Sequence, residues 1–562
     1  MIPDTMRTKF TDWTPILKWL PEYQGAWFGR DLMAGASVWA VLVPLALAYA
    51  EIVGVAPVVG LYTIPLALLA YAVFGGSRLL VVGPDAAVAV LSAGVLASLA
   101  VGADEYLAMT LALALVVGAL YVVFFFLKMG WISDLLPDPV LKGFIEGVVW
   151  VTILKQLGVL LGIEGSFQGF LRTVLTVVEK LPDAHVATTI TSVLSILILV
   201  LIRRFVPRAP GPLIVLVGSI IFVRFLGLDN AGVAVLGEFS SGSWRIGLPS
   251  GISLKQFIAL LPGALAIAVL GYTKSVGALK RAAEQNGEQV DPNRELLAIG
   301  MSNFGAGLGG GYPIAGALSP TAVNIAAGGK TQVANLCAAA LCVLTVFFLL
   351  PVLTSLAMAS LAGIIVVAMA GLSDLGYFRK LWNINRAEFF IGLAAFLGVL
   401  IFDVVTGVTI GVVLALFKLA HNIHDPATTL VGRTPSGAFV DINEHPDARE
   451  IPGMMIGRYY APLVFLNARV LSNKLRVLAR SREGLRVVVL DASASQGVDS
   501  SAVTAMAAAR DDLLAEGIDV WVVNPRKTGW ELVVAALRER GVTVPPVFET
   551  LADAVAEFEQ LS

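Results

Sequence analysis

One stretch constrains the fold of this chain most. Residues 309–331, GGGYPIAGALSPTAVNIAAGGKT, are rich in glycine, proline, serine and threonine, yet they lie inside a long apolar region. The part that can form a helix runs only from about 319 to 327, which at about 1.5 Å per residue is roughly 14 Å, about half of a bilayer core. A short helix that opens on Ser-Pro-Thr after a glycine run is typical of a broken transmembrane helix. Such helices occur at membrane depth where they line a cavity, and their N-termini face anionic ligands.

A glycine-rich nucleotide loop is the soluble alternative, because GAGLGGG stands at 305–311. No strand is predicted before this loop, and no strand–helix–strand unit surrounds it, so the context does not favour a nucleotide site. Composition points the same way. The chain is 57% hydrophobic and 14% charged, with a mean hydropathy of +0.82, whereas soluble proteins carry about 25% charged residues. We therefore predict a polytopic α-helical membrane protein.

Charge and cysteine content narrow the classes of function. The net charge of −2 indicates neither a nucleic-acid partner nor any other strongly charged partner. Cys337 and Cys342 lie in one apolar run and are interpreted as packing residues. Because no His or Cys partner stands at ligand spacing, we predict no disulfide framework, no metal site and no cofactor. Residues 1–23 lack the pattern of a signal peptide and are interpreted as an amphipathic segment on the cytoplasmic surface.

Apolar segments follow one another from residue 32 to about 420, and we count roughly fourteen. The third, ninth and tenth are short or interrupted by Gly and Pro. The segments lie near residues 32–50, 57–74, 84–101, 106–127, 140–162, 187–202, 212–227, 256–278, 295–309, 319–328, 331–350, 352–371, 388–402 and 404–420.

Basic residues predict the orientation, because cytoplasmic loops carry an excess of Lys and Arg. If the N-terminus is cytoplasmic, the even-numbered segments end inside, and most basic residues gather at those ends. They are Arg78, Lys128, Arg203, Arg204, Arg208, Lys280, Arg281, Lys330, Arg379, Lys380 and Arg386. The outer loops hold fewer. An even number of spans with both termini in the cytoplasm is predicted.

The chain also shows an internal repeat. The third segment begins LLVVGPDAAVAVL (79–91), an extended run that is broken at Gly83-Pro84 before a helix start at Asp85. The tenth segment begins comparably, with Gly311-Tyr312-Pro313 leading to a helix start at 319. Each is the third segment of its half if the chain divides as seven plus seven, and repeats of an odd number of spans must be inverted. Two broken helices at matching places indicate a transporter site near the bilayer midplane.

Composition changes after residue 421, and the expected domains are an N-terminal segment (1–30), a transmembrane domain (31–424), a polar linker (425–450) and a soluble domain (451–562). In the soluble domain strands alternate with helices, which indicates a small α/β domain that the topology places in the cytoplasm. The expected strands are MMIGRYY, PLVFLN, RVVVLDAS, DVWVVN and PVFET, and the expected helices cover 468–482, 501–516, 530–540 and the last residues.

Five motifs in this order carry a resemblance to a known family. They are DLMAGASVWAVLVPLALAYAEIVGVAPVVGLYT (31–63), GGSRLLVVGPDAA, DPNRELLAIGMSNFGAGLGGG (291–311), SPTAVNIAAGGKTQ and YYAPLVFLNA (459–468). With this topology, the chain resembles the sulfate permease (SulP) anion transporters, which join a fourteen-helix membrane domain to a cytoplasmic STAS domain. The resemblance covers nearly the whole chain. It implies a multi-pass protein of the cell membrane, and we expect a homodimer.

The resemblance also implies an anion site between the facing N-termini of helices three and ten, which helices one and eight complete. A helix N-terminus carries about half a positive charge and unpaired N–H donors, which suit a small anion. The family site falls on Leu45, Tyr49, Asp85, Ala86, Ala87, Lys274, Ala317, Ser319, Pro320 and Thr321.

Three of these positions depart from the usual family pattern. Many members have Gln or Glu where Leu45 stands, and many have Arg where Pro320 stands. Helix eight usually carries Glu or Asp, and here it carries Lys274. We therefore expect a more cationic site than usual, partly offset if Asp85 pairs with Lys274.

Plainer roles are open for several of these residues. Lys274 could reach the inner interface from a helix end instead of binding the anion. Ser319, Thr321 and Asp85 could be helix caps. In the STAS domain, Ser500 occupies the turn where STAS regulators of another class carry a phosphorylatable serine, and capping explains it as well.

The leading functional hypothesis is a secondary transporter of small anions that works by alternating access and performs no covalent chemistry. An uncoupled anion channel is the first alternative, because the usual carboxylates are missing at Leu45 and Lys274. A sensor that signals through the STAS domain is the second. Sulfate, bicarbonate, chloride and small dicarboxylates all fit a site defined by helix ends. Nucleobase permeases share a related fold but lack a STAS domain.

Overall fold

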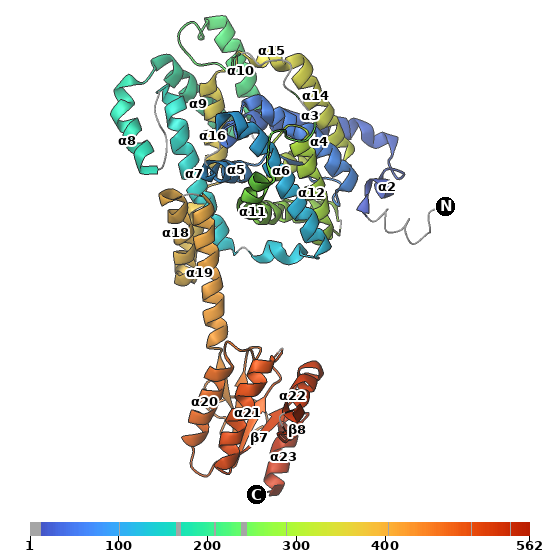
Figure 1. Cartoon of the computed structure of the whole chain (residues 1–562), viewed down its shortest axis with the longest axis vertical. Helices are drawn as coiled ribbons and strands as arrows, with labels where there is room; N and C mark the ends of the chain where they lie inside the picture. Colours follow the sequence, from blue (N-terminus) through green and yellow to red (C-terminus); the bar gives the residue numbers. More distant parts are fainter. Residues whose placement is uncertain are drawn as a thin grey trace. The chain divides into compact units, whose positions relative to one another are not determined.

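The chain forms two compact units, Met1–Val413 and Leu414–Ser562, which we describe separately. The computed structural model describes residues 13–99, 102–135, 137–163, 170–206, 209–237, 244, 246–287, 289–402, 404–495, 497–539 and 541–561. Residues 1–12 of the predicted N-terminal segment lie outside this part of the chain, and the first helix after them is the short α2 (Ile16–Trp19). Figure 1 shows the course of the chain.

Each of the roughly fourteen apolar segments coincides with a helix. Among the described residues, nine helices are long and apolar enough to cross a bilayer, so the first unit is a polytopic membrane domain. The fourteen helices are α3 (Phe28–Val53), α4 (Pro57–Phe74), α5 (Ala86–Ser98), α6 (Ala103–Phe126), α7 (Asp138–Leu161), α9 (Val186–Phe205), α10 (Gly211–Leu226), α11 (Leu254–Asn286), α12 (Pro292–Leu308), α13 (Leu318–Ala326), α14 (Val333–Leu344), α16 (Met358–Ala370), α18 (Arg386–Ile401) and α19 (Val404–His424).

Shorter pieces connect or extend these helices. The eleventh segment continues beyond α14 through a π-helical turn, η4 (Thr345–Leu349), into α15 (Leu350–Leu353). Two connecting helices, α8 (Phe170–Lys180) and α17 (Leu375–Ile384), were not predicted. The remaining turns are η1 (Gly25–Trp27), η2 (Gly130–Leu135) and η3 (Leu181–Asp183).

Helix packing repeats between the two halves. The first helix, α3, packs against α14 and α13, and the eighth helix, α11, packs against α6 and α5 in the same way. Likewise α7 packs against α18, and α16 packs against α9. Each of these contacts therefore has a counterpart with the halves exchanged, as the seven-plus-seven inverted repeat requires.

The glycine-rich run that resembles a nucleotide loop is a helix-packing surface. Gly305 lies in the last turns of α12, and a Cβ at this position would stand 2.4 Å from the backbone oxygen of Leu66 on α4. Only glycine allows such a close approach of the two backbones. The run therefore positions α12 against α4.

Two very short strands cross where the broken helices begin. Strand β1 (Val82–Gly83) leads into α5, strand β2 (Ala315–Gly316) leads into α13, and the two pair in antiparallel register. Because antiparallel strands run past each other, the helices that follow them leave in opposite directions with their N-termini towards the crossing. Helix α5 has 13 residues and α13 has 9, both too short to span a bilayer.

The second unit is an α/β domain with one six-stranded sheet in the order β4-β3-β5-β6-β7-β8. Strands β5 to β8 pair in parallel, whereas β3 pairs in antiparallel register with β4 and β5. The strands are β3 (Thr428–Arg433), β4 (Phe439–Asp441), β5 (Met454–Tyr459), β6 (Val487–Asp491), β7 (Asp519–Val523) and β8 (Val547–Phe548). The helices are α20 (Ala468–Arg480), α21 (Ser500–Ala515), α22 (Lys527–Glu539) and α23 (Leu551–Leu561).

Two expectations for this unit are wrong. Residues 425–450, expected as a linker, contribute strands β3 and β4, because TTLVGR alternates enough apolar residues to pair with β5. The segment PLVFLN, expected as a strand, forms a turn before α20 in which Leu463 alone makes a bridge, to Val498. Here Asn467 accepts the N–H of Val464 and donates to the oxygen of Pro462, so a side chain replaces the missing strand partner.

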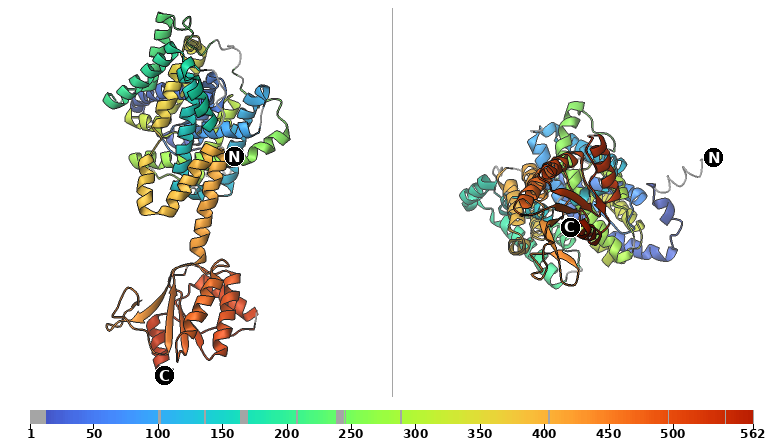
Figure 2. Two further views of the ribbon diagram at one scale, coloured as in Figure 1. Left: turned by 90° about the vertical axis from the view of Figure 1, so that its left-hand side faces the viewer. Right: turned by 90° about the horizontal axis from the view of Figure 1, so that it is seen from below.

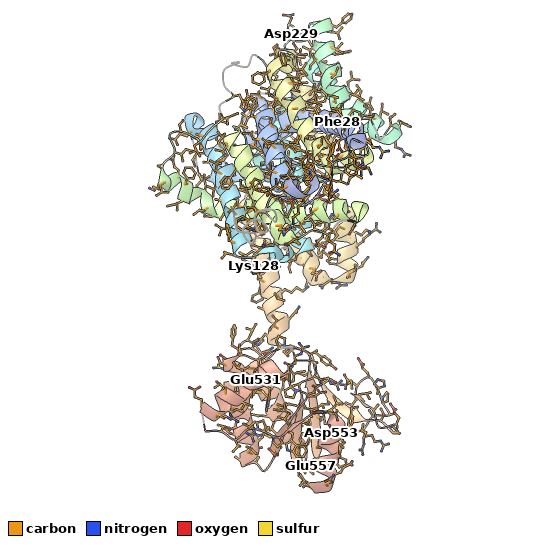
Figure 3. All side chains as sticks on the ribbon, turned by 90° about the vertical axis from the view of Figure 1, so that its right-hand side faces the viewer. Phe28, Lys128, Asp229, Glu531, Asp553 and Glu557 are labelled. Carbon is orange, nitrogen blue, oxygen red and sulfur yellow. The ribbon has the colours of Figure 1, made fainter. Side chains whose placement is uncertain are left out.

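Helices cover both faces of the sheet (Figure 2). Because strand side chains alternate between faces, Val487 and Val489 pack with α23, whereas Val488 packs with α20 and α21. Figure 3 shows the side chains of both units, with Asp553 and Glu557 on α23, one helical turn apart.

Candidate anion-binding site

The first broken helix begins with a carboxylate cap. Asp85 is the N-cap of α5, and its Oδ1 accepts the backbone N–H groups of Ala87 (3.0 Å) and Val88 (3.2 Å). Ala86 and Ala87, the first two residues of the helix, are buried. An acidic cap is stabilised by the positive end of the helix dipole. The capping role considered for Asp85 is therefore confirmed.

Lys274 of α11 reaches the same point. Its Nζ lies 2.6 Å from each carboxylate oxygen of Asp85. The two side chains are only 11% and 13% exposed, so Lys274 does not extend to the membrane interface. The pairing predicted for these two residues is confirmed, and it leaves the pair without net charge.

The second broken helix begins without a side-chain cap. Ala317 is the N-cap of α13 and makes no side-chain cap hydrogen bond, so the capping role considered for Ser319 is wrong. Ser319 is exposed, and Pro320 next to it is buried. The hydroxyl of Thr321 donates to the oxygen of Ala317 (2.6 Å) and accepts the N–H of Val81 (3.0 Å). Thr321 therefore ties α13 to the strand that precedes α5.

Leu45 and Tyr49 of α3 are both buried on the helix that packs against α5 and α13. Tyr49 is close enough to Asp85 for an electrostatic interaction between them. The structure thus brings helices one, three, eight and ten together through residues that the sequence predicted for the site.

Side chains that the sequence interpretation missed hold the segment before β1. Gln332 donates to the backbone oxygens of Ser77 (2.8 Å) and Leu80 (3.0 Å), and Asn335 also donates to Leu80 (2.8 Å). Asn324 of α13 donates to the oxygen of Leu79 (2.8 Å). These amides replace the hydrogen bonds that a continuous helix would supply to its own backbone.

A matching set holds β2 and the segment before it. Asn303 donates to the oxygen of Ile314 (3.2 Å) and accepts its N–H (3.0 Å). The hydroxyl of Ser275 accepts the N–H of Gly316 (2.7 Å), and Thr63 accepts the N–H of Tyr312. The signal for these positioning residues is a buried polar side chain within an apolar segment, which membrane helices keep only for a purpose.

The two helix N-termini differ in what they offer an anion. At α5 the first free N–H groups already bind the Asp85 carboxylate, whereas no side chain caps α13. The ammonium of Lys274 has three donors, and two of its contacts go to Asp85. The candidate site therefore combines one occupied helix end, one helix end without a side-chain cap, and a lysine paired with the carboxylate at the occupied end.

In the second unit, Ser500 is exposed at the first position of α21. The cap is Asp499, which accepts the N–H groups of Ala502 (2.8 Å) and Phe465 (2.7 Å), so capping does not explain Ser500. Asp491 does not take part in this cap. It forms an ion pair with Arg458, in which Nε of Arg458 lies 2.6 Å from Oδ2 of Asp491. Burial, the largest single effect, lowers the pKa of Arg458, but the hydrogen bonds to Asp491 and Tyr460 and the charges of these two groups together leave that pKa above its usual value.

Sequence comparison decides the family. The pattern that describes the sulfate permease family matches residues 28–395, and the pattern of the STAS domain matches residues 445–554. The chain belongs to the sulfate permease family. It is therefore a membrane protein of an anion transporter family with a C-terminal STAS domain.

Individual relatives agree with this family assignment. A probable sulfate transporter of Mycobacterium tuberculosis is 32% identical over 551 residues, which cover 98% of each chain. The chloroplastic sulfate transporter 4.1 of Arabidopsis thaliana is 29% identical and covers 93% of this chain and 79% of its own.

Solved structures share the fold. The murine Solute Carrier 26 family member A9 anion transporter superposes with a TM-score of 0.92 at 23% identity, over 99% of this chain and 95% of its own. The transmembrane domain of the cyanobacterial bicarbonate transporter BicA superposes with a TM-score of 0.60 at 25% identity, over 70% of this chain and 98% of its own.

Proposed function

We propose that this member of the sulfate permease family is a secondary transporter that moves small inorganic anions by alternating access. The anion binds between the N-termini of α5 and α13, with α3 and α11 completing the pocket. The observation that carries this proposal is the meeting of Lys274, Asp85 and two broken-helix N-termini at one crossing of antiparallel strands.

Lys274 supplies the fixed positive charge for the anion. Family members often have Arg where Pro320 stands, and here α13 offers only backbone donors at that place. The ammonium can keep Asp85 and still turn its remaining donor to an anion at the end of α13. Asp85 competes with the anion for Lys274, which limits affinity and allows release.

The substrate class follows from the relatives and from the nature of the site. The relatives carry the names of sulfate and bicarbonate transporters, so the proposed substrates are sulfate, bicarbonate or chloride, with small dicarboxylates as a further class. Helix ends bind such anions through backbone N–H groups and the helix dipole rather than through one specific side chain.

Alternating access requires two groups of helices that move against each other. Helices α3 to α6 pack mainly on α11 to α14, and α7, α9, α16 and α18 pack mainly on one another. We propose that the first group is a rigid core that carries the anion and that the second group is a gate.

Both termini would lie in the cytoplasm of a cell whose plasma or inner membrane holds the protein. A homodimer stays a prediction.

An uncoupled channel is the alternative class. The support for a channel was that positions 45 and 274 carry Leu and Lys instead of acidic residues. Asp85, however, supplies a carboxylate within the proposed site. This carboxylate is a candidate proton or sodium acceptor, so the transporter proposal is favoured. The sensor alternative keeps the exposed Ser500 as its support.

The test is uptake of radiolabelled sulfate, bicarbonate, chloride and succinate into proteoliposomes with purified protein. Each anion is measured under an imposed proton gradient, an imposed sodium gradient and a trapped counter-anion. A transporter concentrates at least one anion when one of these gradients is applied. Flux that follows only the anion's own electrochemical gradient would establish the channel, and no flux of any anion would favour the sensor.

A further inference from the structure

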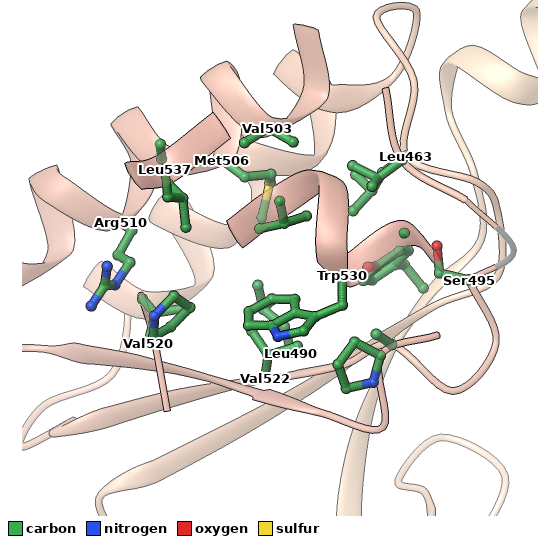
Figure 4. Close-up of a pocket in the computed structure, with 18 of the residues that line it drawn as sticks. Leu463, Leu490, Ser495, Val503, Met506, Arg510, Val520, Val522, Trp530 and Leu537 are labelled. Carbon is green, nitrogen blue, oxygen red and sulfur yellow. The ribbon is translucent and has the colours of Figure 1, made fainter. Parts of the chain in front are cut away.

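The STAS unit contains a cavity of about 120 Å³ between helices α21 and α22 and the sheet (Figure 4). Its walls are apolar. Val503 and Met506 come from α21, Leu537 comes from α22, and Leu490 and Val522 come from the strands. The volume is comparable with the roughly 150 Å³ of an engineered apolar cavity that binds benzene. A single aromatic ring or a short alkyl chain is the body that such a space accommodates.

One charged side chain lines this cavity from a buried position. Arg510 of α21 is only 8% exposed. Its Nη1 donates to the backbone oxygen of Thr543, its Nη2 lies 3.4 Å from the Thr543 hydroxyl, and its Nε has no hydrogen-bond partner. Within the described part of the chain, no carboxylate pairs with this guanidinium, since these contacts to Thr543 are neutral.

Neighbouring ion pairs show that this arrangement is unusual for the domain. Asp512, two residues along α21, pairs with Arg476, and Glu516 pairs with Arg480. Two acidic groups that follow Arg510 in the sequence, Asp512 and Glu516, thus pair with arginines on α20. A buried cation without an anionic partner is costly, and an empty apolar cavity forfeits the dispersion contacts of its walls.

We propose that the cavity is a binding site for a small organic carboxylate, either an aromatic acid or a short-chain acid. The carboxylate binds Arg510, and the apolar body fills the space between α21, α22 and the sheet. In Figure 4, Arg510 lies at one end of the row of lining side chains, Ser495 lies at the other, and the indole of Trp530 stands between them. One ligand then contacts both helices and links α21 to α22.

The test uses the full-length protein in detergent and equilibrium dialysis of radiolabelled benzoate and hexanoate, in the presence of excess sulfate to fill the transport site. The expected result is binding of one carboxylate per chain that sulfate does not displace. Benzyl alcohol, which has the ring without the charge, is expected to compete at least about tenfold more weakly, because a charge-assisted hydrogen bond is lost.

Three variants locate the site. Ala507→Phe fills the cavity from α21 and is expected to abolish binding, and Arg510→Gln is expected to weaken it at least about tenfold. Arg480→Gln removes an exposed, paired arginine of α20 and is expected to bind as the wild type does. Thermal unfolding and anion uptake of each variant report its folding, and Val503→Phe replaces Ala507→Phe if the latter unfolds. Unchanged binding in the filled variant, equal competition by benzyl alcohol, or no bound carboxylate at millimolar concentration would overturn the proposal.

Discussion

At the residue scale, the site depends on a single ion pair at the end of a short helix. The sequence predicted a more cationic site, partly offset if Asp85 pairs with Lys274, and in the structure the Asp85 carboxylate binds both the Lys274 ammonium and the first N–H groups of α5. Removing one partner of a buried pair leaves an uncompensated charge and costs about 3–5 kcal/mol, whereas replacing both by neutral residues is often neutral. Variants of this site must therefore be made in pairs.

Thr321 has a structural role that is separable from anion binding. Thr321→Val keeps the shape but leaves the Val81 N–H without its partner, which costs about 1–3 kcal/mol. We expect a lower melting temperature and reduced uptake. Ser319→Ala, at an exposed position of the same helix that makes no cap hydrogen bond, is the matched control, and we expect its melting temperature to be unchanged. Equal melting temperatures for the two variants would refute the positioning role of Thr321.

At the element scale, the broken helices exist because other side chains replace their missing backbone hydrogen bonds. Gln332, Asn335 and Asn324 bind the segment before β1. Asn303 binds the residue before β2, and Ser275 binds β2 itself. The segment before β2 also approaches the backbone of α4 closely, which glycine at position 311 permits.

Gly311 is the position at which this close approach can be tested. A Cβ at Gly311 would stand 2.2 Å from the Thr63 hydroxyl and 2.5 Å from the Thr63 Cα, so the Gly311→Ala variant must displace α4 or the segment between α12 and β2. We expect loss of uptake and a destabilisation of about 1–3 kcal/mol or more, measured by thermal unfolding.

Gly277→Ala is the matched control. Gly277 lies within α11, and a Cβ added there would have no neighbouring atom within 4 Å, so alanine should stabilise this helix by about 0.5–1 kcal/mol and leave uptake intact. If both alanine variants behave alike, the close approach at Gly311 has no role in the site.

The elements that the sequence predicted were those with a long apolar run or a clear interruption by glycine and proline. The membrane helices, the break at Gly83-Pro84 and the short helix after Pro313 follow from local residue types. The pairing of Val82 with Gly316 and the contacts of Asn303 and Gln332 join residues far apart in the chain, so no local pattern specifies them. The strand at 428–433 was missed because a short run flanked by Pro and Gly is typical of a linker.

At the scale of the whole membrane unit, the helices pack in two groups, which we propose act as a core and a gate. Rigid-body alternating access requires that distances within the core stay fixed while distances between core and gate change. Exposed positions suitable for spin labels are Leu69 on α4, Val123 on α6 and Phe390 on α18.

Pulsed electron paramagnetic resonance measures these distances in proteoliposomes, after Cys337 and Cys342 are replaced by alanine. The Leu69–Val123 distance is expected to be the same with and without a transported anion. The Leu69–Phe390 distribution is expected to shift or to contain two populations. A fixed Leu69–Phe390 distance in protein that still transports would contradict rigid-body alternating access.

The measurement that tests the central claim most directly is the apparent affinity for a transported anion in four proteins: wild type, Asp85→Asn, Lys274→Met and the double variant. Asparagine keeps the cap and frees the lysine, so Asp85→Asn should bind the anion most tightly, by about tenfold or more over wild type. Lys274→Met should bind it most weakly, because it leaves the Asp85 carboxylate alone, and the double variant should lie between wild type and Lys274→Met. The melting temperature of each protein is measured as the control for folding. If folded Lys274→Met protein transports with wild-type affinity, Lys274 is not the counter-charge and the site assigned here is wrong.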